Sequence, residues 1–419
     1  MQTAPGSQHH ESRAQTLIAS AFAGTPGRLR LFGAVAMIVC VIYGIAGFLL
    51  VNHLDNSLGQ ERAHAAQLVR IQTIRTSLVK AEANATNAFL VGGLEPADAR
   101  KGYVEGIDAA AATLAEASNA ESGSDAQRLQ AVNKVLTTYT GLIESARANN
   151  RQGFPIGAAY LRQASKSIRD EALPPLAELV SAERKKVDDA SNTVGNVQDG
   201  LLLVLLVVVV GLVGTQVWLY RRTHRVINPF LAAATTMVVL TGVVALGVIG
   251  WSRDRDNQAR EGPYAQTVAL ATVRIDGFDA KSSESLTLIA HGSGQTFEER
   301  FRSVAAEASQ ALPGAADPDT QETLRAYLAR HITVRALDDG GKYEQAVLLA
   351  TGNGQANVAF AEFEAASGRA LTTRSTKLSD DLAHARFPLL ALSLLLLAAG
   401  VAAAFASRQG IAQRLQEYR

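Results

Sequence analysis

The chain has 419 residues, 47% of them hydrophobic and 19% charged, and its formal net charge is +1 at pH 7. This composition would fit an ordinary soluble protein if the hydrophobic residues were evenly spread, but they are concentrated in four uncharged runs, which excludes that class. The single cysteine, Cys40, lies inside the first run, so an intramolecular disulfide is excluded as well.

The four runs predict transmembrane helices. They cover residues 31–51, 201–220, 230–251 and 387–406, and none contains Asp, Glu, Lys or Arg. A helix of about 20 residues crosses the roughly 30 Å of hydrocarbon in a bilayer. The first run is longer than the roughly 7–15 apolar residues of a signal peptide and no small-residue cleavage site follows it, so we expect an uncleaved anchor.

The distribution of basic residues predicts the topology. Segments 1–30, 221–229 and 407–419 hold nine of the 40 basic residues and two of the 39 acidic ones, which leaves 31 basic and 37 acidic residues in segments 52–199 and 252–386. Because Lys and Arg accumulate in short cytoplasmic loops, we expect both termini and the short loop in the cytoplasm and the two long segments outside. The polar N-terminal segment lacks an apolar period, so we expect a disordered tail.

Helical periodicity in segment 52–199 predicts a four-helix bundle. A first helix from about residue 55 ends at Gly92-Gly93, a second begins after Pro96, and a fourth begins at Pro155 and continues into the second span. The third carries the clearest apolar stripe, which consists of Leu129, Val132, Leu136, Tyr139, Ile143 and Ala146. Pro174-Pro175 predicts a kink in the fourth helix, which serves either as a flex point or only to shape the bundle.

Segment 252–386 repeats this plan. After the third span we expect a helix to about residue 291 and a second helix over residues 295–312. A third helix ends at residues 338–341, a short helix covers residues 343–350, and a long last helix leads into the fourth span. The order span–bundle–span thus occurs twice, which indicates a duplication. The sequence therefore predicts an all-α integral membrane protein with two extracytoplasmic up-down four-helix bundles in tandem.

No catalytic, cofactor or metal motif is present. The chain has no Gly-x4-Gly-Lys-Ser/Thr loop, no Cys/His metal spacing and no His-Glu-x-x-His. Gly292-x-Gly294 and Gly352-x-Gly354 lie between helices and are interpreted as turns. The spans offer only groups such as Gln216 and Thr235, which can bond helix carbonyls or neighbouring helices, so the ionisable groups typical of an ion path are missing. We expect no enzyme, no cofactor and no metal site.

Two groups of polar residues are candidate contact sites. In the first outer segment, guanidinium and amide groups suit a carboxylate ligand, with a solvated helix face as the alternative. On the inner side, basic residues offer a docking surface, or else only set the topology and contact anionic lipid. The outer candidates are Arg70, Arg75, Asn84, Asn149, Arg151 and Arg162. The inner candidates are Arg221, Arg222, Arg225, Arg408, Arg414, Tyr418 and Arg419.

The span–bundle–span plan resembles the sensory modules of bacterial chemoreceptors and histidine kinases, but only residues 407–419 follow the last span, so we expect no built-in output domain. A closer resemblance, over nearly the whole chain, is to the GlnX family of four-span actinobacterial membrane proteins. It is carried by the inner turn Arg221-Arg222-x-x-Arg225-x-x-Asn228-Pro229, by Gly157-Ala-Ala-Tyr-Leu-Arg-x-Ala-Ser165, and by the tail Gly410-Ile-x-x-Arg-Leu-x-Glu-Tyr-Arg419.

This resemblance implies a relay in the plasma membrane of a bacterium. An outer solute-binding lipoprotein of the GlnH type, which senses amino acids such as aspartate or glutamate, would contact the bundles, and a cytosolic Ser/Thr kinase of the protein kinase G type would receive the signal. About 280 outer residues face about 50 inner ones, so we expect a non-enzymatic transmembrane signal relay. The alternatives are a permease or export component and a cell-envelope scaffold. We expect contact with membrane lipid and no nucleic-acid partner, and a homodimer is compatible with the pattern.

Overall fold

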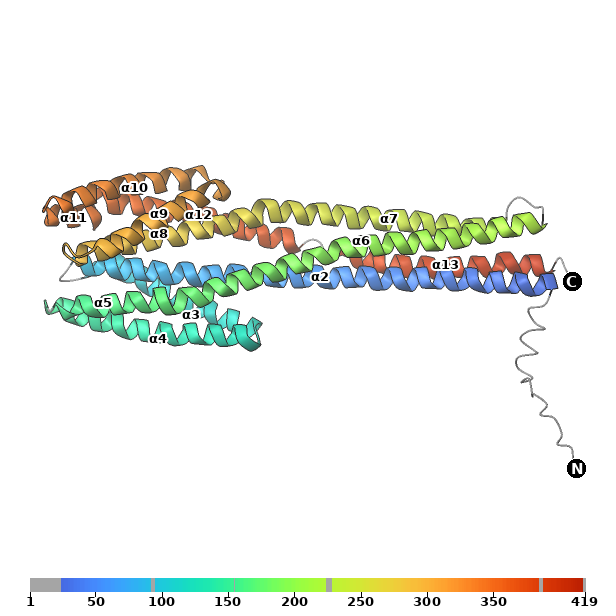
Figure 1. Ribbon diagram of the computed structural model, residues 1–419, viewed down its shortest axis with the longest axis horizontal. Coiled ribbons are helices and arrows are strands. Elements are labelled where there is room, and N and C mark those ends of the chain that lie inside the picture. The colour runs from blue at the N-terminus through green and yellow to red at the C-terminus, as the bar shows by residue number, and fades with distance from the viewer. Residues whose placement is uncertain (1–23, 92–94, 154, 224–227, 384–386, 417–419) are drawn as a thin grey trace, which may run out of the picture. The chain divides into compact units, whose positions relative to one another are not determined.

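The computed structural model describes residues 24–91, 95–153, 155–223, 228–383 and 387–416, which form helices and no strand (Figure 1). The predicted all-α fold is confirmed. The first α-helices are α2 (Gly24–Val91), α3 (Ala97–Ala120), α4 (Gly123–Arg151), α5 (Ile156–Lys166) and α6 (Leu173–Thr223). They are followed by α7 (Pro229–Ala259), α8 (Ala265–Ile289), α9 (Gln295–Ala315), α10 (Pro318–Asp339), α11 (Tyr343–Ala350), α12 (Gln355–Ala383) and α13 (Phe387–Gln416). Two short π-helices, η1 (Ser167–Ala172) and η2 (Arg260–Tyr264), precede α6 and α8.

The chain divides into two compact units. The transmembrane unit comprises residues 1–59, 190–255 and 384–419, and the bundle unit comprises residues 60–189 and 256–383. Helices α2, α6 and α7 contribute residues to both. The four helices that are long and apolar enough to cross a membrane contain the four predicted spans. The chain is therefore a membrane protein by the length and composition of these helices.

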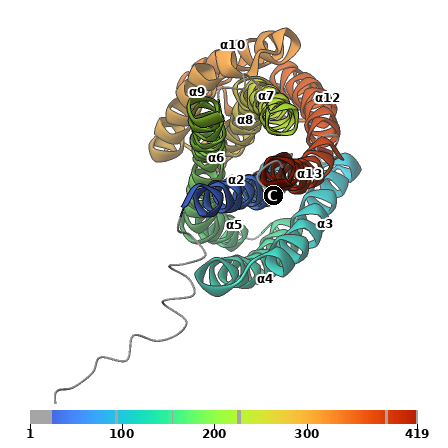
Figure 2. The same cartoon turned by 90° about the vertical axis from the view of Figure 1, so that its right-hand side faces the viewer.

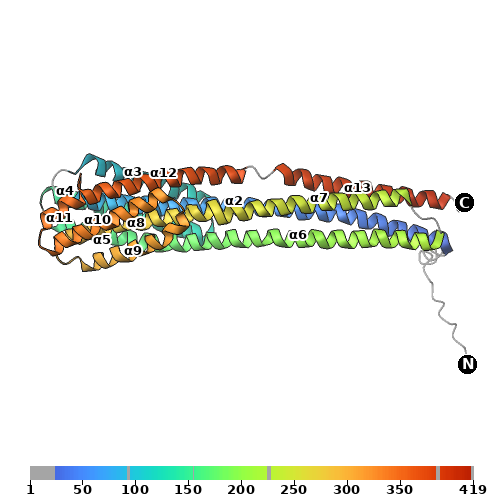
Figure 3. The same ribbon diagram turned by 90° about the horizontal axis from the view of Figure 1, so that it is seen from above.

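Within the transmembrane unit, α2 and α13 approach each other closely through glycines. A Cβ atom on Gly400 would lie 2.5 Å from Gly44 Cα and 2.8 Å from Cys40 O, so this crossing requires glycine. Small residues at such contacts let two helix backbones pack directly, which is the main source of helix association in a bilayer. Figures 2 and 3 show the four helices of this unit end-on and from the side.

Polar groups of the spans join neighbouring helices. Gln216 Nε2 donates to Leu231 O at 3.1 Å and to Thr235 Oγ1 at 2.8 Å, which links α6 to α7. Asn228 Nδ2, just before α7, donates to Gly410 O of α13 at 2.8 Å. These hydrogen bonds agree with the prediction that polar span residues bond helix carbonyls and neighbouring helices.

Prolines explain where the observed helices differ from the predicted ones. Near Pro174-Pro175, where the sequence predicts a kink, the structure has the π-helix η1, which ends two residues before the first proline, and η2 contains Pro263. Since proline has no N–H and its ring clashes with the carbonyl four residues earlier, a wider π-helical turn relieves the conflict. Helix α9 continues through Pro313 to Ala315, beyond its predicted end at residue 312. Arg374 donates to the Ala315 carbonyl, which stabilises this last turn.

In the bundle unit, α2 and α8 lie between the other helices, with α3, α4 and α5 beside α2 and α9 to α12 beside α8 (Figure 1). Val79 and Ala83 of α2 belong to the apolar core formed mainly by α8 to α12, and Leu286 of α8 belongs to the core formed by α2 to α6. The two long segments, which the sequence predicts as bundles in tandem, therefore share cores within one unit. The reason is that α8 has no solvated face over residues 275–288, which are all buried.

Candidate functional site

The buried middle of α8 contains ionisable side chains. Asp279 is 2% exposed, and Lys281 and Glu284 are each 1% exposed. Burying a charge strongly destabilises a protein unless an opposite charge or several hydrogen bonds compensate. The partners of these three side chains therefore determine how the helices of the bundle unit fit together.

Glu82, Arg169, Asp279 and Ser282 form a cluster that we name the central ion cluster. Arg169 Nε donates to Glu82 Oε1 at 3.1 Å, and Arg169 Nη2 lies 3.3 Å from Asp279 Oδ1. Arg169 Nη2 also donates to Ser282 Oγ at 3.1 Å, and that hydroxyl donates to Glu82 Oε1 at 3.0 Å. Ser165 Oγ is a further donor to the same oxygen. Helices α2, η1 and α8 thus meet at one guanidinium group, whose side chain is 15% exposed.

Electrostatics keep the guanidinium charged and make Glu82 dependent on it. Burial opposes the charged form of Arg169, but Glu82 and Asp279 outweigh this effect and raise its pKa. Burial raises the pKa of Glu82, and Arg169 offsets part of that rise. Among the described residues, Glu82 Oε2 has no hydrogen-bond partner. Removal of Arg169 would therefore leave a buried carboxylate without its main counter-charge.

A second group of buried charges, which we name the histidine cluster, consists of Lys281, Glu284, Glu298 and His331. Lys281 Nζ lies 2.8 Å from Glu284 Oε1, His331 Nδ1 lies 2.8 Å from Glu284 Oε2, and His331 Nε2 lies 3.1 Å from Glu298 Oε2. A neutral imidazole has only one N–H, so a ring placed between two carboxylates is held as the doubly protonated cation. Burial lowers the pKa of His331, but its hydrogen bonds to the two glutamates outweigh burial and raise the pKa overall.

Helix α12 is joined to α2 and α8 by further polar contacts. Lys80 Nζ of α2 lies 2.9 Å from Glu364 Oε1, and Arg274 of α8 donates to Ser367 Oγ at 2.7 Å. With the central ion cluster, these contacts connect α2, η1, α8 and α12. We name this set the polar junction. Each of these four segments is adjacent to a predicted span in the sequence: α2 contains the first span, η1 precedes the second, α8 follows the third and α12 precedes the fourth.

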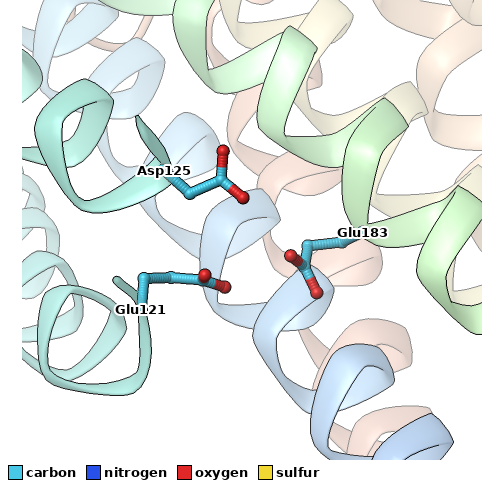
Figure 4. A group of neighbouring side chains, drawn as sticks. All are labelled: Glu121, Asp125 and Glu183. Carbon is cyan, nitrogen blue, oxygen red and sulfur yellow. The ribbon is translucent and has the colours of Figure 1, made fainter. Parts of the chain in front are cut away.

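Three carboxylates at the corner between α3, α4 and α6 resemble a metal site. The ligand atoms of Glu121, Asp125 and Glu183 lie within 4.8 Å of one another (Figure 4). Lys186 Nζ lies 3.0 Å from Asp125 Oδ2 and 2.5 Å from Glu183 Oε1, and His64 Nδ1 lies 2.8 Å from Glu183 Oε2. Burial opposes the charged form of Lys186, but its hydrogen bonds to Glu183 and Asp125 raise its pKa. The ammonium group supplies the positive charge that a metal would supply, so we interpret the group as an internal ion cluster.

The six predicted outer candidates do not converge on one site in the described part of the chain. Four of them bond within their own helix: Arg70 to Gln67 Oε1 at 3.2 Å, Arg75 to Gln72 Oε1 at 3.2 Å, Asn84 to Lys80 O at 2.9 Å, and Asn149 to Ser145 O at 2.9 Å. Arg70 Nε lies 3.9 Å from Glu116 Oε2. Arg151 and Arg162 are exposed, and Arg151 lines a cavity between α2, α3, α4 and α5.

Of the inner candidates, Arg221 at the end of α6 and Arg408 on α13 are exposed. The side chains of Arg222 and Arg414 lie outside the described part of the structure, as do Arg225, Tyr418 and Arg419 entirely. A docking role for these residues remains a prediction.

The residues of the central ion cluster were not selected from the sequence. Glu82 and Ser282 are 200 positions apart, and no spacing rule connects such residues. The available signal is an acidic residue on an apolar helical stripe, since Glu82 lies four residues after Leu78 and three residues before Ala85. An ionisable residue on a face that is otherwise buried indicates a buried partner.

The structure defines the class of protein as an all-α membrane protein with four helices able to cross a bilayer and a helical bundle unit. More particularly, residues 57–192, about a third of the chain, match a family model described as actinobacterial sensor domain. This region includes Glu82 and Arg169. Comparisons with curated proteins and with solved structures give no match. A region similar to a sensor domain indicates a role in sensing or signal transduction.

Proposed function

We propose that the chain is a non-enzymatic transmembrane signal relay in a bacterial plasma membrane. In this proposal the termini are cytoplasmic, and the bundle unit lies outside, where it contacts a solute-binding lipoprotein of the GlnH type that has bound an amino acid. The inner ends of the spans pass the state of the bundle unit to a cytosolic Ser/Thr kinase of the protein kinase G type. The match of residues 57–192 to a sensor domain supports the sensory part of this proposal.

The observation that carries the proposal is the polar junction. Buried ion pairs require good geometry, and breaking one by removing a partner destabilises a protein by about 3–5 kcal/mol. Helices joined by such pairs therefore tend to move together when one of them shifts. Helix shifts of about 1–2 Å at interfaces are a known means of transmitting a signal. Since α2 and α6 each run on into a candidate span, a shift that starts in the bundle unit has a covalent route into the membrane.

The relay is tested in the host bacterium by the phosphorylation of cytosolic kinase substrates after addition of external glutamate. The test variant is Glu82→Gln/Arg169→Met, which removes the pair without leaving either charge alone, and the control is Arg325→Met, which replaces an exposed arginine of α10 outside the polar junction and outside the candidate contact residues. We expect the response in the wild type and the control and its loss in the double variant, at equal amounts of protein in the membrane. An unchanged response after deletion of the whole chain would refute the relay.

The inner docking surface is tested separately. Replacement of Arg221, Arg222 and Arg225 by Gln is expected to abolish co-purification of the kinase, provided that cysteine labelling shows the topology to be preserved. Equal recovery of the kinase would mean that these arginines act only on topology and lipid contact.

A further inference from the structure

A cavity of about 330 Å³ lies in the bundle unit between the end of α2, the start of α3, the end of α4 and α5. Its volume falls at the lower end of the roughly 300–1,000 Å³ that is typical of small-molecule sites. The floor is apolar, and its side chains are those of Ala85, Ala88, Phe89, Ile143, Ala146 and Leu161. All of these residues lie within the region that matches the sensor-domain family.

The rim of the cavity is charged, and most of its charges are already paired. Arg147 Nη2 lies 2.7 Å from Glu95 Oε1, and Arg147 Nη1 lies 2.8 Å from Glu144 Oε1. Arg100 Nη1 lies 3.1 Å from the same Glu144 oxygen. The Arg147 guanidinium also stacks over the ring of Tyr103, with 4.3 Å from Cζ to the ring centroid. These contacts hold the two arginines and two glutamates in fixed positions and leave them electrically balanced.

Arg151 is the rim arginine without a contact ion pair, although its charge reaches Glu95 and opposes the rise in the pKa of that carboxyl. Within the described residues it forms no ion pair and no side-chain hydrogen bond, and its side chain is exposed at the cavity. The rim therefore carries three arginines against two glutamates. A guanidinium group presents donors in a planar fork that fits a carboxylate with two parallel hydrogen bonds.

We propose that this cavity binds a small organic carboxylate, with its anionic group on Arg151 and its short apolar chain on the alanine, phenylalanine and leucine floor. The cavity volume limits the length of the ligand's apolar chain, and the ligand carboxylate accepts a charge-assisted hydrogen bond from Arg151. That such a ligand is a sensed signal rests on the proposed relay, whereas its binding does not.

Binding is measured by calorimetry on the purified full chain in lipid nanodiscs, with empty nanodiscs as the blank for partition into lipid. The probes are hexanoate, hexylammonium and hexanol, which share a chain and differ in charge. We expect hexanoate to bind at least tenfold more tightly than the other two, because a hydrogen bond to a charged group contributes that much. In the series acetate, butyrate, hexanoate, each added methylene is expected to tighten binding about fourfold until the cavity is filled.

Two variants locate the site. Arg151→Gln is expected to weaken hexanoate binding at least tenfold, and the control Arg325→Gln, at an exposed arginine of α10 outside the cavity lining, is expected to leave it unchanged. Ala88→Leu, which fills the floor, is expected to weaken hexanoate more than acetate. Thermal unfolding without ligand checks that each variant is folded.

The proposal is overturned if hexylammonium binds as tightly as hexanoate, if Arg151→Gln binds hexanoate like the wild type, or if the wild type binds none of the carboxylates. A chain that binds hexanoate without any change in kinase signalling would keep the binding site and contradict only the role of such a ligand as a sensed signal. The relay itself fails if deletion of the chain leaves the response to external glutamate unchanged, so the two failures are distinguishable.

Discussion

His331 is a buried side chain on α10, and it contacts Glu284 of α8 and Glu298 of α9. Its charge therefore affects the packing of these three helices. Its other neighbours are the ring of Phe301, stacked at 3.4 Å between centroids, and the charges of Lys281 and Arg335, which pair with the same two glutamates. Loss of the imidazolium proton would leave one carboxylate facing a ring nitrogen that cannot donate. The histidine cluster is therefore sensitive to alkaline pH.

We expect the stability of the bundle unit to fall as pH rises through the folded-state pKa of His331. That pKa is raised above the unfolded value of about 6.5, so the stabilisation is complete below about pH 6.5 and is lost above it. Urea unfolding followed by circular dichroism at several pH values measures this slope. His331→Gln, which does not titrate, should remove the part of the slope above pH 6.5. An unchanged slope in that variant would contradict the assignment.

Asp276 on α8 gives a separate pH effect at lower pH. Burial, together with repulsion from Glu307 and Asp279, raises its pKa to about 7, and Arg75 only partly offsets this. The folded state therefore binds more protons than the unfolded one between about pH 4 and pH 7, and stability falls as pH rises through that window. Asp276→Asn is expected to stabilise the chain at pH 8 by roughly 2–4 kcal/mol. A variant less stable than the wild type at pH 8 would show that Arg75 and not burial dominates.

At the scale of helices, the packing of α8 against α12 depends on a glycine. A Cβ atom on Gly277 would lie 2.4 Å from Phe363 Cε1 and 2.6 Å from Cζ, and the Phe363 side chain is fully buried. Gly277→Ala is expected to destabilise the chain by about 1–3 kcal/mol through overpacking. Gly141→Ala on α4 is the matched control, because nothing lies within 4 Å of its added Cβ and helix propensity should stabilise the chain by roughly 0.5–1 kcal/mol. Equal effects of the two changes in urea unfolding would contradict this account of the α8–α12 contact.

The sequence predicts the helix ends that depend on interactions between residues close together in the chain. The start of α3 after Pro96 and the bounds of α11 follow from glycine and proline chemistry, which acts within a few residues. The helix end predicted at Gly92-Gly93 lies outside the described residues. The apolar spans follow from composition alone. The polar junction could not be predicted, because Glu82, Arg169 and Asp279 come from segments that local patterns do not connect. The burial of α8 could not be predicted from the period of its apolar residues either, since its polar residues are buried together with its apolar ones.

For the cavity, the sequence points to Arg151 as a candidate ligand group but not to the cavity beside it. Arg151 was among the arginines predicted as ligand groups, but its place beside an apolar floor depends on how the ends of α2 and α4 meet. Asn150 Nδ2 donates to Phe89 O in the last turn of α2, which fixes that meeting. Gly157 permits it from the α5 side, since an added Cβ would lie 3.0 Å from Ala146 O.

In the molecule as a whole, the proposed relay requires that the polar junction transmit a shift of one helix to the other helices that it joins. The sensor-domain match covers residues 57–192, which supply Glu82 and Arg169, while Asp279 and Ser282 come from the other half of the bundle unit. A signal received by either half would therefore reach the helices of both. Pairs such as Glu82–Arg169, Arg169–Asp279 and Glu284–His331 each join two helical segments. We infer that these buried pairs fix the relative positions of the helices and supply specificity more than stability.

The most direct test is the distance between spin labels at the ends of two spans, measured by double electron–electron resonance. Cysteines replace the exposed Arg221 and Arg408 in a Cys40→Ala background, so that each chain carries two labels. We expect Glu82→Gln/Arg169→Met, a change far from the labels in sequence, to shift the mean distance by about 1–2 Å or to broaden its distribution, and the control Arg325→Met to leave it unchanged. Identical distance distributions in the wild type and the double variant would contradict the claim that the polar junction sets the position of the spans.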